Sequence, residues 1–141
     1  MGGAYEEYLA FLESLGQTLE QLTELAREKA DAVRRGDLVE LDGCMKREQA
    51  LSLTLRSMDK KRENMLGKLG LSGVPLSGLA GRYPQELRSR AKTVADGVDE
   101  RYRVYASAAS AAQTALECSL HQIEKVLLKQ EDGGAFTDIR V

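Results

Sequence analysis

The sequence from Pro84 to Gln130 reads PQELRSRAKTVADGVDERYRVYASAASAAQTALECSLHQIEKVLLKQ, and this stretch decides the fold. Apolar residues recur in it at spacings of three and four. Such spacing places them on one stripe of an α-helix, which completes a turn every 3.6 residues. The sequence therefore predicts one long helix whose apolar seam needs partner helices. The seam positions are Leu87, Ala91, Val94, Val98, Tyr105, Ala112, Leu116, Ile123 and Val126 or Leu127.

Two further helical patterns precede this stretch. The first runs from about Ala4 to Arg35, with a narrow apolar stripe that predicts an amphipathic helix packed along one side. Gly36 is a natural left-handed cap, and Asp37 with Glu40 forms an acidic version of a capping box that starts the next helix. Because a stop signal touches a start signal, we expect the first two helices to lie antiparallel. The apolar positions of the first helix are Tyr8, Leu12, Leu15, Leu19, Leu22, Ala26 and Val33.

The second helix is predicted over 38–69, and it is followed by a connector rich in glycine and proline. The connector spans residues 71–83, where Leu76 to Ala80 could form one helical turn. We therefore predict an all-α fold: an antiparallel bundle of three long helices with coiled-coil-like packing, closed by the long C-terminal helix as far as Leu116. Residues 1–130 form a single helical bundle domain, and 131–141 a flexible C-terminal tail. The predicted buried positions of the second helix are Leu38, Leu41, Met45, Leu55, Met58, Met65, Leu66 and Leu69.

Composition argues against several classes of function. The formal charge is -2, from 20 Lys and Arg against 22 Asp and Glu, so the basic excess of a nucleic-acid-binding domain is missing. No apolar run is long enough to insert into a membrane, and no signal peptide is visible. Cys44, Cys118 and the single His121 match no zinc spacing, and no nucleophile has a base near it in the sequence. We expect a cytoplasmic protein that is not an enzyme and has no cofactor and no metal.

The lengths of the predicted helices indicate where a partner would bind. At 1.5 Å per residue, the second helix spans roughly 48 Å and the last helix roughly 70 Å. The last helix therefore overshoots the turn at Gly36 by roughly 22 Å, over about residues 117–130. Apolar residues there would lack a partner within the chain unless the first helix or the tail covers them, and exposed apolar stripes mark interaction sites. The predicted partner-binding residues are Leu116, Leu120, Ile123, Val126 and Leu127.

The order of these parts resembles a known family. The sequence carries KADAVRRGD at 29–37, REQAL at 47–51, KRENML at 61–66 and LGL at 69–71, ahead of the long helix. Together they resemble the FlgN family of flagellar type III export chaperones from about Tyr5 to Gln130. The chain departs from the family in the middle of the last helix, where members often have asparagines and this chain has the alanine-serine tract 106–112.

The resemblance implies a function that the residue pattern alone does not supply. It implies a cytoplasmic chaperone that holds hook-filament junction proteins and delivers them to the flagellar export machinery. It also implies that the C-terminal helix engages an amphipathic helical segment of the cargo. The pattern itself leaves a second class open, which is a homo-oligomeric coiled-coil scaffold or adaptor protein with no secretion role.

Overall fold

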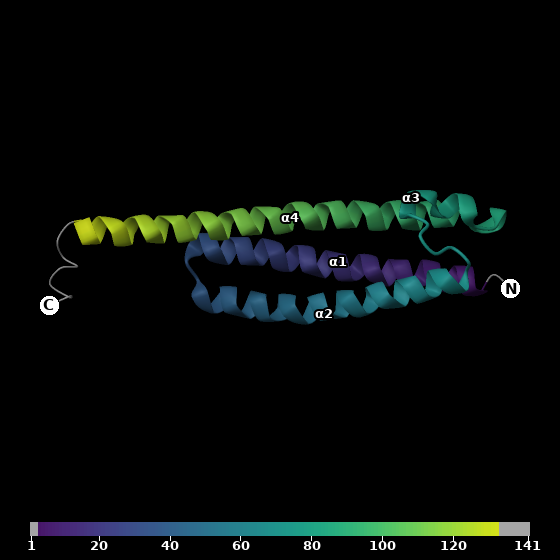
Figure 1. Ribbon diagram of the computed structural model, residues 1–141, viewed down its shortest axis with the longest axis horizontal. Helices are drawn as coiled ribbons and strands as arrows, with labels where there is room; N and C mark the ends of the chain where they lie inside the picture. The colour runs from purple at the N-terminus through teal and green to yellow at the C-terminus, as the bar shows by residue number, and fades with distance from the viewer. Residues whose placement is uncertain (1–2, 133–141) are drawn as a thin grey trace.

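The computed structural model describes residues 3–132, and helices make up almost all of that range (Figure 1). The long helices are α1 (Gly3–Arg35), α2 (Leu38–Lys68) and α4 (Gln85–Asp132). Between α2 and α4 lie the single turn α3 (Leu76–Leu79) and a 3-10 turn (Ala80–Arg82). None of the described residues forms a strand, so the predicted all-α class is confirmed. No helix in this range is long and apolar enough to cross a membrane.

The reversal between α1 and α2 forms as its sequence predicts. Gly36 adopts a left-handed conformation with φ of 68°. The backbone N–H of Asp37 donates to the carbonyl of Ala32 at 2.9 Å, which closes the end of α1. The Asp37 carboxylate in turn accepts from the backbone N–H of Glu40 at 3.0 Å, which caps the start of α2. The two helices consequently lie antiparallel (Figure 1).

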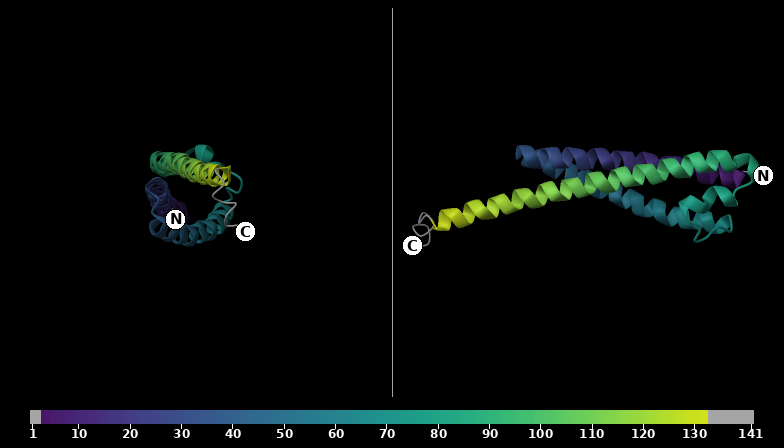
Figure 2. Two further views of the ribbon diagram at one scale, coloured as in Figure 1. Left: turned by 90° about the vertical axis from the view of Figure 1, so that its left-hand side faces the viewer. Right: turned by 90° about the horizontal axis from the view of Figure 1, so that it is seen from above.

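The three long helices form an open arrangement with α1 in the middle. Helix α1 packs against both α2 and α4, whereas no Cα atom of α2 lies within 8 Å of one in α4. Helix α4 runs in the same direction as α1 and opposite to α2 (Figure 1). Seen along its length, the molecule is open on the side where α2 and α4 would meet (Figure 2). The expectation that the three helices close a bundle was therefore wrong in this respect.

Burial along α1 explains the arrangement. We expected a narrow stripe on this helix, but it buries a wide face because it has a neighbour on each side. Leu9, Phe11 and Leu25 lie outside the predicted stripe and are buried with it. The buried residues of α1 are Tyr8, Leu9, Phe11, Leu12, Gly16, Thr18, Leu19, Leu22, Thr23, Leu25, Ala26, Ala30, Ala32 and Val33.

Helix α2 is held less deeply. Only Cys44 and Leu66 among its residues are fully buried, and two predicted buried positions, Leu38 and Met45, are exposed. A charged residue interrupts its inner face at Glu48, which pairs with Lys29 of α1 at 3.1 Å. Helix α2 therefore buries fewer side chains than α1, and its backbone approaches only that of α1 among the long helices.

The end of the molecule near the N-terminus holds the larger hydrophobic cluster. The predicted helical turn in the connector is confirmed as α3, with Leu79 buried and Leu76 half-buried. Tyr83 is also buried, and its hydroxyl donates to the carbonyl of Tyr5 at 3.0 Å. Burial raises the pKa of Tyr83 far above its ordinary value, so its hydroxyl keeps the proton that it donates. The connector thereby fixes the start of α4 against the start of α1.

A second, smaller cluster consists of alanines. Ala26 and Ala30 of α1 pack against Ala108, Ala112 and Ala115 of α4. Small side chains let two helix backbones approach closely, and Ala108 and Ala112 of this cluster belong to the alanine-serine tract. Helix α4 continues two residues beyond its predicted end, to Asp132. The predicted flexible tail otherwise falls on 133–141, which lie outside the described residues.

Candidate partner-binding surface

The last part of α4 extends beyond the other helices. Val33 and Arg34, at the end of α1, line a pocket together with α4 residues from Ala111 to Gln122. From there α4 continues to Asp132 with no other described helix beside it (Figures 1 and 2). We call residues 120–132 the α4 overhang, and at 1.5 Å per residue it is about 18 Å long. The structure thus places a free helix end where the comparison of helix lengths predicted one.

Large apolar side chains of the overhang are exposed. Leu120, Ile123, Val126 and Leu127, which we predicted as partner-binding residues, are between 51% and 55% exposed. The fifth predicted residue, Leu116, is half-buried and lies before the overhang. Leu128 was not predicted, and it is also exposed. The structure therefore brings four of the five predicted residues together on one segment where their side chains are exposed.

These residues continue a face of α4 that is buried elsewhere. Leu116, Leu120, Ile123 and Leu127 follow one another at spacings of four, three and four. At 100° per residue they prolong the line that begins with Val98, which is buried against α1. Where α1 ends, no other described helix lies over the same face.

The direction of each side chain around α4 divides the overhang into faces. Leu120, Ile123 and Leu127 form a stripe, which we call the overhang stripe. Val126 and Leu128 lie about a quarter turn to either side of it, as the 100° rotation per residue requires. A two-turn apolar stripe on a helix binds best to the apolar face of another helix. The site therefore suits helix-to-helix contact, and none of the side chains on the stripe carries acid-base or nucleophilic chemistry.

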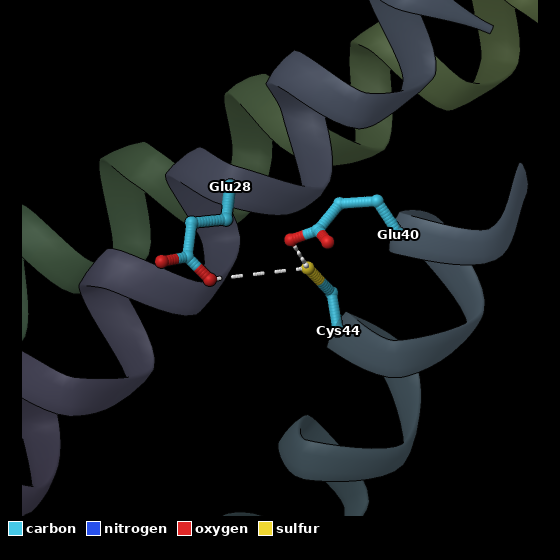
Figure 3. A group of neighbouring side chains, drawn as sticks. All are labelled: Glu28, Glu40 and Cys44. Atoms are coloured by element: carbon cyan, nitrogen blue, oxygen red, sulfur yellow. Dashed lines mark hydrogen bonds between the residues drawn. The ribbon is translucent and has the colours of Figure 1, made fainter. Parts of the chain in front are cut away.

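Sequence reasoning missed one cluster of polar side chains, on α1 and α2. Glu28 of α1 and Glu40 and Cys44 of α2 point toward one another (Figure 3). The Cys44 sulfur lies 3.7 Å from a Glu40 oxygen and 4.0 Å from a Glu28 oxygen. These three residues come from two helices and follow no known ligand spacing, so no sequence motif could have revealed them.

The cluster around Cys44 is held together by ion pairs that link α1 to α2. The guanidinium of Arg47 lies 3.4 Å from Glu28 and 3.7 Å from Glu40, and so offsets part of the negative charge of the two carboxylates. Burial, together with Glu40, raises the pKa of the Cys44 thiol. Because metals bind the thiolate form, a thiol held neutral is a poor ligand. Arg47 thus links the two carboxylates in a contact between α1 and α2.

The sequence of this chain matches one known protein family over most of its length. A family model described as FlgN protein matches residues 1–130. No curated protein and no solved structure matches the chain. The matched range includes α1, α2, the connector and α4 as far as residue 130, so it covers all of the overhang except its last two residues.

Proposed function

This chain belongs to the FlgN family, and we propose that it is a cytoplasmic flagellar export chaperone for hook-filament junction proteins. The observation that carries the proposal is the match over residues 1–130, which agrees with the resemblance seen in the sequence. FlgN is a chaperone family, so the protein acts by binding rather than by catalysis. In this role it holds a junction protein after synthesis and delivers it to the type III secretion apparatus.

The overhang stripe is the surface on which we propose that the cargo binds. A helical segment of the cargo lays its own apolar face along Leu120, Ile123 and Leu127, with Val126 at one edge. Leu116 contacts the end of that segment where α1 stops. Each Leu or Ile side chain buried in such a contact contributes about 1.5–3 kcal/mol. Three or four anchors of this kind supply the apolar part of the binding free energy, from which the entropy lost on association is subtracted.

An overhanging helix end also suits release of the cargo. A segment bound there contacts one helix and touches little of the α1–α2 core, so it can leave without disturbing that core. Residues beyond Gln122 have no tertiary packing from another described helix, and such regions open locally at low cost in free energy. The core therefore keeps its fold while the cargo is held and after it is handed over.

Binding to a junction protein tests this function. The full chain is mixed with the C-terminal segment of a hook-filament junction protein, and binding is measured by co-purification and by calorimetry. We expect a 1:1 complex with a Kd in the micromolar range or tighter. The matched control is the same segment with the apolar positions of its helix replaced by Asp, which should not bind. Absence of binding by the unmodified segment at micromolar concentrations would contradict the proposal.

A further inference from the structure

The open side of the molecule contains an apolar groove between α2 and α4. Its volume is about 620 Å³, and α1 forms its floor. The groove exists because α2 and α4 both pack on α1 and not on each other. Tyr102 on its α4 side is 58% exposed, so part of the apolar lining faces solvent. The apolar lining consists of Leu15, Leu19, Leu55, Leu76, Val98 and Tyr102.

The α2 rim of this groove carries positive charge. Asp59 pairs with Arg62 at 3.6 Å within α2, so these two charges balance each other. Arg56 and Lys60 line the same rim, and neither has an ion-pair partner among the residues that the structure describes. On the α4 side, Asp99 is neutralised by Arg103 at 2.9 Å. The groove therefore has an apolar lining and, along its α2 rim, two cations that no described carboxylate pairs with, Arg56 and Lys60.

The overhang stripe matches this groove in length. From Leu55 to Arg62 the α2 wall spans eight residues, which is about 10 Å of helix. From Leu120 to Leu127 the overhang stripe also spans eight residues and about 10 Å. Two turns of helix fit beside two turns of groove.

The charges match as well. Glu117 and Glu124 are seven residues apart, and the helical rotation places both of them on the same side of the overhang stripe. Neither has a cationic partner in the described part of the chain; Glu117 accepts only a hydrogen bond from Gln113, at 3.1 Å. The acidic residues beside the overhang stripe therefore complement the basic residues on the α2 rim of the groove.

The overhang cannot reach the groove of its own chain. Helix α4 is continuous from Gln85 to Asp132. Leu120 lies 18 residues after Tyr102, which is about 27 Å further along a straight helix. Any overhang that fills the groove must therefore come from another molecule.

We propose that two copies of this chain associate reciprocally, the α4 overhang of each lying in the groove between α2 and α4 of the other. The two α4 helices then run antiparallel, and a two-fold axis passes near residue 111, midway between groove and overhang. This contact is isologous, so it closes at two copies and does not propagate into a filament. It also covers the overhang stripe, and, if the proposed function holds, cargo and a second copy compete for that stripe.

Sedimentation equilibrium of the full chain with two matched variants tests the association. Tyr102→Asp places a charge in the groove, and Ile123→Asp places one on the overhang stripe. Both side chains are more than half exposed, so helicity measured by circular dichroism should be unchanged. We expect each variant alone to associate at least about tenfold more weakly than the wild type, because a carboxylate loses hydration in the contact. Leu53→Asp, at an exposed position of α2 that does not line the groove, is the control and should associate normally.

Mixing the two variants gives the decisive result. A mixed pair contains one intact contact, the overhang of the Tyr102→Asp copy in the groove of the Ile123→Asp copy, so association should partly recover.

Exchanging the charges across the contact is a second test. Lys60→Glu should weaken association, and adding Glu124→Lys in the same chain should restore it. A wild type that is monomeric at every concentration, a Tyr102→Asp variant that associates normally, or a mixture that shows no recovery would each overturn the proposal. Because Tyr102→Asp leaves the overhang intact, its binding of the junction-protein segment separately reports on the proposed function.

Discussion

Replacing Ile123 and Leu127 together by Asp should abolish binding of the junction-protein segment while leaving the helices intact. Both side chains lie on the overhang stripe and are about half exposed, so the free protein loses little stability. In the complex, the variant loses two apolar anchors worth about 1.5–3 kcal/mol each and must bury two carboxylates. The Kd should therefore rise about a hundredfold or more, as measured by calorimetry.

A matched variant shows whether the position on the helix is what counts. Leu128 is on the same overhang and is also exposed, but it lies about a quarter turn away from the stripe. Leu128→Asp should therefore bind the segment nearly as the wild type does. If the double variant Ile123→Asp and Leu127→Asp bound the segment normally, the overhang stripe would not be the cargo site.

Leu12→Ala should be among the most destabilising single truncations of an aliphatic side chain in the fold. Leu12 has no exposed surface and belongs to the larger hydrophobic cluster, which joins α1 to α2, the connector and α4. Removing a fully buried Leu side chain costs about 2–5 kcal/mol, through lost burial and the cavity left behind. That is a large part of the 5–15 kcal/mol by which domains of this size are typically stable. Urea unfolding followed by circular dichroism measures the change.

The control for this prediction is Leu53→Ala. Leu53 is 64% exposed on the outer face of α2, so its truncation should change the free energy of unfolding by about 0.5 kcal/mol or less. Equal losses of stability for the two variants would mean that the hydrophobic cluster around Leu12 is not what holds α1 in place.

Local signals in the sequence predicted the helices accurately. Gly36 and Asp37 mark the first reversal because their conformation and hydrogen bonding depend on a few neighbouring residues. The length of α4 followed from a seam that runs without interruption to the end of the helix. Simple arithmetic on helix lengths then predicted the overhang, since each residue adds a fixed rise. These features need no knowledge of which helices are neighbours.

Features that depend on neighbours were predicted less well. The narrow stripe assigned to α1 omitted Leu9, Phe11 and Leu25, which widen its apolar face and show that it has two partners. Near the start of α2, Cys44 is buried and Met45 exposed, so the inner face there is shifted by one residue from the predicted one, whereas Leu55, Met58, Met65 and Leu66 pack against the core as predicted. A face with few apolar residues specifies its own rotation weakly.

The groove and the cluster around Cys44 had no signal in the sequence. Both bring together residues from different helices, and their existence depends on how far α2 and α4 stand apart. An apolar pattern reports that a face is buried but not which helix covers it. The candidate cargo site was predictable because it lies on one helix, whereas a site between helices was not.

Hydrogen exchange of the full chain, with and without the junction-protein segment, tests the central claim most directly. In the free protein, amides of the overhang should exchange faster than those of α1, because no other described helix packs beside them. Addition of the segment should slow exchange across residues 116–129 of α4 and leave the core of α1 unchanged. Unchanged exchange in the overhang on saturation with the segment, with protection appearing on α1 or α2 instead, would contradict the assignment of the overhang as the surface that holds the cargo.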